Sequence, residues 1–553
     1  MKNTILKDRQ LAVLERLIIV GLALVPLFFS FPYRVNIFLS WEGAYRLYSG
    51  QIPYKDFGLP MGFAFWVIPA VFFKIFGPYL ISLVKAQVFV NIISGLAFLS
   101  ILKSFSIDRP LRLICLLVFC ISYSFFNFWP WYDQSVIVFE IIAISFVLKS
   151  IFSENSKYST LYLALGSLFA FISIFTKQDG GGMAFMICFA LITYNTIIER
   201  KIKPLLLFAL FFFLVSCLVI IPFVPYNFTY WFNYGQSYQN SRLSVYDIIS
   251  AFLAESQWIK FYLFIIVLML IFEIRKSKKI LKDKKFMLFI ILTIGILGEA
   301  SIYQVTSYTP PDNNIFFHSF AFAFIFGNLE FIKQINFRQI GLIIGSTFLV
   351  LLWWSGSYWK YIDRLARKFI PQFETTDSDK VSIHTYMDRA SSSNLNADMN
   401  VWVYSDLKVF KDIYMPQSTV NGMTRLMKMP LIKNGGARLK VLNMTELTPL
   451  AYQIGYKLET GDDIPLWYHK GVGMFQKQVD SYCDKIKNHF YDLVLFENIP
   501  ELNNFYPFEV DSALNKYYKK VDSFSGPRRA QVSEIEVFVK PDSSDSVRNY
   551  SHN

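Results

Sequence analysis

The sequence predicts an α-helical polytopic membrane protein with about eleven transmembrane helices and a C-terminal extracytoplasmic α/β domain. Hydrophobic residues make up 54% of the 553 residues and charged residues only 17%, whereas a soluble domain has about 25% charged residues. Long apolar stretches fill residues 1–356, and the sequence then becomes polar over residues 357–541. The net charge of +13 does not indicate nucleic acid, because the basic residues cluster between apolar stretches, where they set membrane topology.

Eleven apolar stretches have the length of about 17–25 residues that a transmembrane helix needs. They lie at 14–31, 78–102, 111–128, 134–152, 159–175, 181–198, 205–222, 259–274, 286–304, 315–332 and 339–356. The stretch 63–76 is also apolar, but Gly77 and Pro78 end it before it reaches spanning length. We therefore expect it to be interfacial or re-entrant, inside a first outer loop at 32–77.

Basic residues are distributed unequally over the connections between these stretches. If the N-terminus is cytoplasmic, the inner connections carry 21 Lys and Arg residues, including the run RKSKKILKDKK at 275–285, and the outer connections carry seven. This bias fits the positive-inside rule. An odd number of spans then places residues 357–553 outside the cytoplasm.

The polar C-terminal region, 357–541, has the pattern of a small α/β domain. MNVWVYSDL (399–407) and VSEIEVFVK (532–540) read as strands, and SYCDKIKNHFYDLVLFENIP (481–500) reads as a helix leading into a strand. The glycine pair in IKNGGARLK lacks the spacing of a nucleotide-binding fingerprint, and the histidines are too scattered for a metal site. We expect residues 542–553 to be a disordered tail.

Polar side chains gather at the predicted outer ends of the helices. Ionisable residues near the membrane interior are costly and tend to face a cavity rather than lipid. The inner connections show nothing comparable beyond basic residues, so this one-sided set indicates a site that handles a charged, membrane-bound substrate from outside. Its members are Glu42, Asp56, Lys85, Asp133, Lys177, Gln178, Asp179, Glu299 and His318.

Each of these residues also has a purely structural interpretation. Asp56 can cap a turn, Lys85 can extend its ammonium group to the interface, and Asp133 is placed to cap a helix. The turn KQDGGG can simply end a helix, and the tryptophans and tyrosines are first of all an interface belt. The joint placement of the polar residues on one face favours a functional role.

Two segments near the N-terminus resemble a known family. WEGAYRLYSGQIPYKDFG (41–58) and FFKIFGPYLISLVKAQ (72–87) follow the pattern acid-G-x-Y, then G-x-x-P-Y-x-D-F, then F-x-K-x-F-G. This pattern resembles the polyprenyl-phosphate-sugar-dependent glycosyltransferases of the GT-C fold, the group of protein O-mannosyltransferases and lipid A aminoarabinose transferases. The resemblance is strongest over 17–103. The family typically has Asp-Glu where this chain has Trp41 and Glu42.

The resemblance implies a GT-C-like catalytic module at residues 1–356. A sugar would move from a polyprenyl-phosphate donor to an acceptor hydroxyl on a lipid, glycan or protein at the extracytoplasmic face, typically with inversion. Glu42 would be the general base, supported by Asp56 or Asp133. The tryptophan and tyrosines around Glu42 would bury it and so raise its pKa, or stack on sugar rings.

The donor phosphate needs cationic or hydrogen-bonding partners. The candidates are Arg46, Lys85 and Lys177. The family typically has an arginine near the position of Lys85. No cofactor is certain: related enzymes sometimes bind a divalent metal ion at such acids, and a single loop glutamate leaves this undecided.

Two other function classes stay open. A membrane polymerase or ligase of surface polysaccharide usually presents a large outer loop between late helices, but the longest such connection here is 223–258. A transporter of a lipid-linked glycan predicts charges in both halves of the membrane and often inverted repeats, and no repeat is evident. Trp41 also leaves open a scaffold whose catalytic site has decayed.

Overall fold

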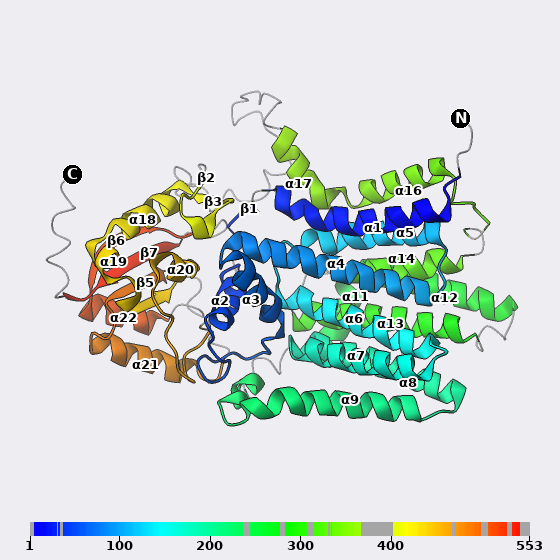
Figure 1. Ribbon diagram of the computed structural model, residues 1–553, viewed down its shortest axis with the longest axis horizontal. Coiled ribbons are helices and arrows are strands. Elements are labelled where there is room, and N and C mark those ends of the chain that lie inside the picture. Colours follow the sequence, from blue (N-terminus) through cyan, green and yellow to red (C-terminus); the bar gives the residue numbers. More distant parts are fainter. Residues whose placement is uncertain are drawn as a thin grey trace.

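The computed structural model consists of a helical bundle with a smaller domain of strands and helices at one end (Figure 1). It describes residues 5–29, 31–33, 37–235, 244–276, 283–307, 315–329, 332, 334–366, 402–466, 468, 472–498, 507–527 and 533–541. The predicted tail at 542–553 lies outside these residues, as does most of the segment between the bundle and the first strand of the C-terminal domain.

Every predicted span overlaps a helix of the bundle. These helices are α1 Asp8–Leu24, α4 Leu80–Ser104, α5 Arg109–Ser122, α6 Tyr132–Phe152, α7 Ser156–Ile174, α8 Gln178–Glu199, α9 Lys203–Ile220, α12 Gln257–Lys276, α13 Lys284–Thr306, α14 Phe316–Asn328 and α16 Ile340–Trp353. In the described residues, eight helices are long and apolar enough to cross a membrane. The protein is therefore an integral multi-pass membrane protein, as the sequence predicts.

Three of the predicted spans are shorter helices than their apolar stretches suggest. α5 and α16 have 14 residues each and α14 has 13. α5 ends at Ser122 because the chain turns into a 3₁₀ segment, Ser124–Phe126. It also holds Arg112, whose charge is buried against Glu15 of α1 at 2.9 Å, so a charged pair interrupts this part of the apolar interior.

The connections meet at two opposite ends of the bundle, in the alternation that the sequence predicts. At the end away from the C-terminal domain, where α1 begins, Arg338 pairs with Asp8 and Lys284 pairs with Glu199 (Figure 1). The connections predicted to be outside lie at the end next to the C-terminal domain. The cytoplasmic placement of the N-terminus stays a prediction.

The first outer loop forms two helices between the bundle and the C-terminal domain, α2 Ile37–Tyr48 and α3 Ala64–Phe76 (Figure 1). α3 is the short apolar stretch. It ends at Phe76. The next residue, Gly77, has a φ of +85°, which favours glycine, and its N–H donates to the Phe73 carbonyl. A short strand of the same loop, β1 Phe31–Pro32, pairs with a strand of the C-terminal domain.

The C-terminal domain contains two small sheets. One has the order β1-β3-β2, and the other has the order β4-β5-β7-β6 with β4 and β5 parallel. The elements are β2 Trp402–Tyr404, β3 Ile413–Pro416, α18 Gln417–Lys428, α19 Pro430–Gly435, β4 Val441–Met444, α20 Leu450–Ile454, α21 Phe475–Lys487, β5 Leu493–Asn498, α22 Phe508–Tyr517, β6 Lys519–Ser525 and β7 Glu534–Val539. The predicted helix leading into a strand is α21 and β5, and the predicted last strand is β7.

The C-terminal domain begins after two helices at the upper edge of Figure 1, α16 and α17 Ser355–Ala366. A further short helix, α11 Val245–Glu255, precedes α12 in the bundle. The predicted boundary at residue 357 falls within α17 and stays a prediction.

One apolar core joins the first outer loop to the C-terminal domain. Trp41, Phe57 and Trp66 are fully buried in the same cluster as Val409 and Met423 of the domain. Burying such large side chains contributes much of the stability of a packed interface. The domain is thereby fixed over α2, which positions the candidate site.

Candidate functional site

Helix α2 presents different residues to its two neighbours. On the bundle side, the Ser40 hydroxyl donates to the Pro130 carbonyl at 2.5 Å and the Trp41 indole N–H donates to the Pro78 carbonyl at 2.8 Å. A Cβ atom at Gly43 would lie 2.2 Å from the Trp66 ring, so α2 approaches α3 too closely for any side chain there. Glu42 and Arg46 lie one turn apart and line a cavity under the C-terminal domain.

Glu42 and Arg46 form a buried ion pair. Arg46 Nη2 lies 2.9 Å and Nε lies 3.0 Å from the same carboxylate oxygen, Glu42 Oε1. The Glu42 side chain is 9% exposed and the Arg46 side chain 5%. Among the described residues, the second carboxylate oxygen, Oε2, has no hydrogen-bond partner. That oxygen is the one available to accept a proton.

The remaining contacts of Arg46 fix its guanidinium group. Nη1 donates to the Gln51 side-chain oxygen at 2.8 Å and to the Glu459 carbonyl at 3.0 Å. The group also lies 5.2 Å from the centroid of the Phe57 ring. Because Arg46 is held from several sides, Glu42 is held in one position as well.

Burial raises the pKa of Glu42 above its ordinary value, and the charge and hydrogen bond of Arg46 offset only part of that rise. A carboxylate with a raised pKa accepts protons more readily than an exposed one. From the sequence we expect the neighbouring aromatic residues to bury Glu42. Trp41 does contribute to the packing, but it is fully buried and stacked on Tyr45 with 4.5 Å between ring centroids, so its ring has no free face for a sugar.

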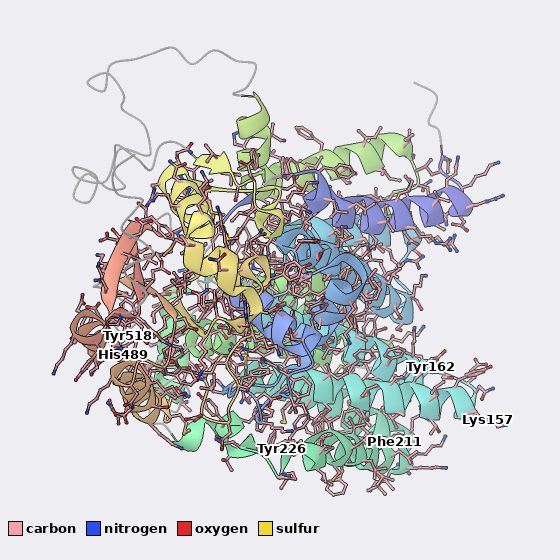
Figure 2. All side chains as sticks on the ribbon, turned by 60° about the vertical axis from the view of Figure 1, so that its left-hand side comes forward. Lys157, Tyr162, Phe211, Tyr226, His489 and Tyr518 are labelled. Atoms are coloured by element: carbon pink, nitrogen blue, oxygen red, sulfur yellow. The ribbon has the colours of Figure 1, made fainter. Side chains whose placement is uncertain are left out.

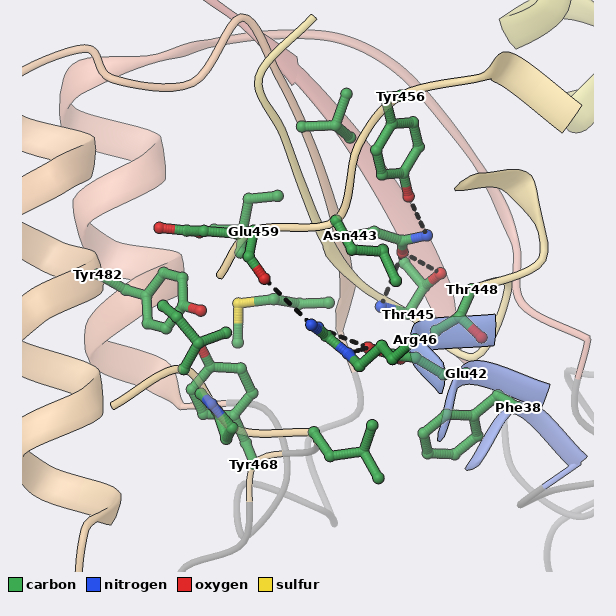
Figure 3. A pocket seen from close by; sticks show the side chains of 17 residues that line it. Phe38, Glu42, Arg46, Asn443, Thr445, Thr448, Tyr456, Glu459, Tyr468 and Tyr482 are labelled. Atoms are coloured by element: carbon green, nitrogen blue, oxygen red, sulfur yellow. Dashed lines mark hydrogen bonds and ion pairs between the residues drawn. The ribbon is translucent and has the colours of Figure 1, made fainter. Parts of the chain in front are cut away.

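The cavity beside Glu42 lies between α2 and the C-terminal domain and measures about 90 Å³ (Figure 3). The domain contributes mainly hydroxyl and amide groups to its wall. The Asn443 amide donates to the Tyr456 hydroxyl at 3.2 Å and accepts from the Thr445 hydroxyl at 2.7 Å. The Thr448 hydroxyl is buried and has no hydrogen-bond partner among the described residues. Such a group is costly unless a ligand or water satisfies it.

A segment of the C-terminal domain, residues 456–466, covers the cavity and is bonded to the first outer loop. The Gly58 N–H donates to the Ile464 carbonyl at 2.7 Å, and the Leu466 N–H donates back to the Gly58 carbonyl at 2.9 Å. The Gly461 N–H donates to the Asp56 carbonyl at 2.9 Å. The predicted site residues of the first loop therefore lie under this segment.

A second group of predicted residues meets at the end of the bundle that is predicted to be outside. Lys177 Nζ lies 2.8 Å from Asp133 Oδ1 and 3.1 Å from Asp179 Oδ2. The Ser307 hydroxyl bonds both to Lys177 and, at 3.1 Å, to Asp179. Burial disfavours the charge of Lys177, but the two aspartates outweigh it and raise the pKa of the lysine.

The other predicted residues are separate from these two groups. Asp56 Oδ2 accepts from the Ile52 N–H at 2.7 Å and so closes the turn after α2. Gln178 donates to the Trp231 carbonyl at 3.0 Å. Lys85 Nζ lies 4.1 Å from the centroid of the Phe76 ring and has no acidic partner among the described residues.

His318 and Glu299 lie inside the bundle. His318 Nδ1 and the Tyr262 hydroxyl are 2.8 Å apart, and the histidine ring packs against Trp354 with 5.0 Å between centroids. The Glu299 carboxyl lies against the carboxyl of Glu140 on α6, and both side chains are fully buried.

Two comparisons by sequence gave no result: no family model and no curated protein matches the chain. Among solved structures, ArnT from Cupriavidus metallidurans in the apo state matches with a TM-score of 0.50 and 12% identity over 95% of this chain and 97% of that chain. This chain has the fold of ArnT. A crystal structure of ArnT from the same organism bound to undecaprenyl phosphate matches with a TM-score of 0.48 and 11% identity over 96% and 98%.

The ArnT fold confirms the GT-C fold class that the sequence predicts, including a small sheet domain in the C-terminal region. Three residues beside the predicted ones in this ArnT-like chain were not identified from the sequence: Asn443, Thr448 and Glu140. Asn443 and Thr448 come from the C-terminal domain, about 400 residues after Glu42, and no local motif marks them. Glu140 could have been found, since it is a lone carboxylate inside an apolar stretch.

The candidate acids do not fit a divalent metal. Among the described residues, no group of three His, Cys, Asp or Glu side chains is placed to hold an ion. The Arg46 guanidinium already occupies one oxygen of Glu42, and the Lys177 ammonium lies between the two aspartates. A second cation at either place would meet a positive charge.

Proposed function

We propose that this protein is an integral membrane glycosyltransferase that moves a sugar from a polyprenyl-phosphate donor to an acceptor hydroxyl at the extracytoplasmic face. The observation that carries the proposal is Glu42 itself: a buried carboxylate, in the motif position of the catalytic acid, with one oxygen directed by Arg46 and the other unpaired among the described residues. The ArnT-like fold and the two motifs at 41–58 and 72–87 support it.

In the proposed reaction, the acceptor hydroxyl oxygen attacks the anomeric carbon as the bond from that carbon to the phosphate oxygen breaks. Glu42 Oε2 takes the hydroxyl proton, and polyprenyl phosphate leaves with the electron pair of the broken bond. Attack from the face opposite the phosphate inverts the anomeric centre. A general base of this kind contributes about 10²–10⁴-fold to a rate.

The proposal gives different tasks to the other predicted acids. Asp56 closes the turn that carries the covering segment, and Asp133 holds Lys177. Both are therefore proposed as positioning residues. Lys85, which has no acidic partner among the described residues, is proposed to meet the donor phosphate.

The C-terminal domain is proposed to bind the acceptor. Its hydroxyl and amide groups face Glu42 across the cavity, and the unpaired Thr448 hydroxyl suits a hydroxyl-bearing acceptor. A cavity of about 90 Å³ is smaller than the roughly 300–1,000 Å³ of typical ligand sites. Residues 456–466 would therefore move away from the first loop when substrates enter.

The test is sugar transfer by the purified protein with synthetic polyprenyl-phosphate sugars and a membrane extract as the acceptor source. Glu42→Gln keeps the volume and an oxygen for Arg46, and we expect it to release polyprenyl phosphate at least about 10²-fold more slowly than wild type. Glu154→Gln, an exposed acid near the other end of the bundle, is the matched control. Equal rates for wild type and Glu42→Gln would reject Glu42 as the base.

A further inference from the structure

An apolar groove runs along the side of the bundle between α3, α4, α6 and α7. It encloses about 410 Å³. Ile93 and Ala97 of α4 form one wall, and Ile142 and Phe146 of α6 form another. The groove lies away from the cavity at Glu42, since none of its lining residues belongs to α2 or the C-terminal domain.

The groove extends from Ile68 of α3 toward the end of the bundle that is remote from the C-terminal domain, where it reaches Lys149 of α6. Along α6 it extends from Val138 to Lys149, three residues before the helix ends at Phe152. At about 1.5 Å per residue this is ~16 Å, roughly half of the ~30 Å hydrocarbon thickness of a bilayer. The groove is therefore about as long as one leaflet is thick, and it reaches to within one turn of the remote end of α6.

Lys149 lines the remote end of the groove, and Lys103 lies about one turn beyond the lining residue Ser100 on α4. Lys149 Nζ lies 5.3 Å from the centroid of the Phe146 ring and 5.7 Å from that of Tyr162. Lys103 is in the last turn of α4, which packs against α6, and its positive charge acts on that of Lys149. Neither lysine forms an ion pair within the described ranges. Two adjacent positive charges without a counter-ion are unfavourable until an anion binds between them.

We propose that this groove binds one acyl chain of an anionic phospholipid from the leaflet at this end, with the lipid phosphate at Lys103 and Lys149. An acyl chain gains little by moving from lipid into an apolar groove, because the two environments are equally apolar. The preference for one lipid must then come from its charged headgroup. A polyprenyl-phosphate donor fits less well, since its phosphate would lie at the opposite end of the bundle.

Native mass spectrometry of the full-length protein in detergent tests the proposal. The probes are phosphatidylglycerol and phosphatidylcholine with identical chains. We expect wild type to retain phosphatidylglycerol at a concentration about tenfold lower, because each basic residue near a lipid surface favours anionic headgroups. Absence of this preference in wild type overturns the proposal.

Two variants and a control locate the site. Lys103→Gln with Lys149→Gln should abolish the preference for phosphatidylglycerol. Lys157→Gln removes an exposed lysine at the same end of the bundle and should preserve it; Figure 2 shows Lys157 directed outward beyond Tyr162. A preference that survives loss of both groove lysines overturns the headgroup assignment.

A third variant tests the groove. Ala97→Leu should fill it and weaken retention of phosphatidylglycerol at least about tenfold with both lysines present. Unchanged retention overturns the acyl-chain assignment. Polyprenyl phosphate, run as a competitor, should not displace phosphatidylglycerol, and displacement that Ala97→Leu abolishes would assign the groove to the donor lipid instead. The proposal stands apart from the function assigned to Glu42.

Discussion

Replacing Arg46 by glutamine should move the pH dependence of transfer to higher pH. The Arg46 guanidinium makes contacts of 2.9 and 3.0 Å with Glu42 Oε1, and both side chains are buried. Glutamine removes the charge but keeps similar length. Burial already raises the pKa of Glu42, and Arg46 is what limits the rise. In Arg46→Gln the pKa of Glu42 must therefore rise further.

The size of the effect follows from the geometry of the pair. An opposite charge within about 4–6 Å lowers the pKa of a carboxyl group by about 1–3 units, so its removal should raise the pKa of Glu42 by about that amount. A general base works only when it is deprotonated. Activity thus rises with pH through this pKa, and the acidic limb of kcat/KM, which reports the free enzyme, should shift upward by about 1–3 pH units.

The assay is the profile of kcat/KM against pH for wild type and Arg46→Gln. Below both acidic limbs the variant should be slower by about 10–10³-fold, and the ratio should shrink as pH rises. Arg46→Lys keeps the positive charge, so the acidic limb of its kcat/KM profile should stay near that of wild type. Arg338→Gln removes an arginine paired with Asp8 at the other end of the bundle and serves as the control. If the acidic limb of the Arg46→Gln profile coincides with that of wild type, Arg46 does not set the pKa of the general base.

Two further predictions concern the other predicted residues. Lys177→Gln leaves two partly buried aspartates without their cation, and we expect the free energy of unfolding to fall by about 1–3 kcal/mol. This loss should appear as a lower apparent Tm in detergent, which Lys177→Arg should largely restore. An unchanged Tm would contradict the structural role of this lysine. Glu299→Gln removes one of two facing buried carboxyls while the amide can still bond to Glu140, so Tm should not fall and transfer should persist. Loss of transfer by a folded Glu299→Gln protein would place Glu299 in the substrate site, as the sequence suggests.

The sequence predicts those features that depend on local spacing. Apolar length predicts the helices of the bundle. The sequence places Glu42 and Arg46 in a loop, and the structure adds helix α2, which brings these two residues, four positions apart, onto one face. The grouping of Lys177 with Asp133 also follows from the predicted topology, since both come at the outer ends of neighbouring spans. These predictions need only helix geometry and the membrane thickness.

Features that depend on distant contacts could not be predicted in the same way. Glu459 bonds to Arg46 across 413 residues, and nothing in the local pattern around Glu459 distinguishes it from other loop glutamates. Strand β1 is another case, since Phe31 and Pro32, where the first predicted span meets the first outer loop, complete a sheet whose other strands follow residue 400. Such contacts are set by how the domain docks, and that docking depends on many apolar residues at once.

The position of Trp41 bears on whether the site is working or decayed. The family pattern has a second acid there, and its loss could mean lost function. Yet the Trp41 indole N–H bonds to the Pro78 carbonyl, and the ring packs in the core between α2 and α3. The Trp41 ring contacts the rings of Tyr45 and Phe73, whereas Glu42, one residue on, has Arg46 beside it. A buried carboxylate is costly unless it is paired; Arg46 pairs with Oε1 of Glu42 only. The ion pair, together with an Oε2 that has no hydrogen-bond partner among the described residues, supports our proposal of a single-carboxylate enzyme, and the Glu42→Gln experiment distinguishes such an enzyme from a scaffold.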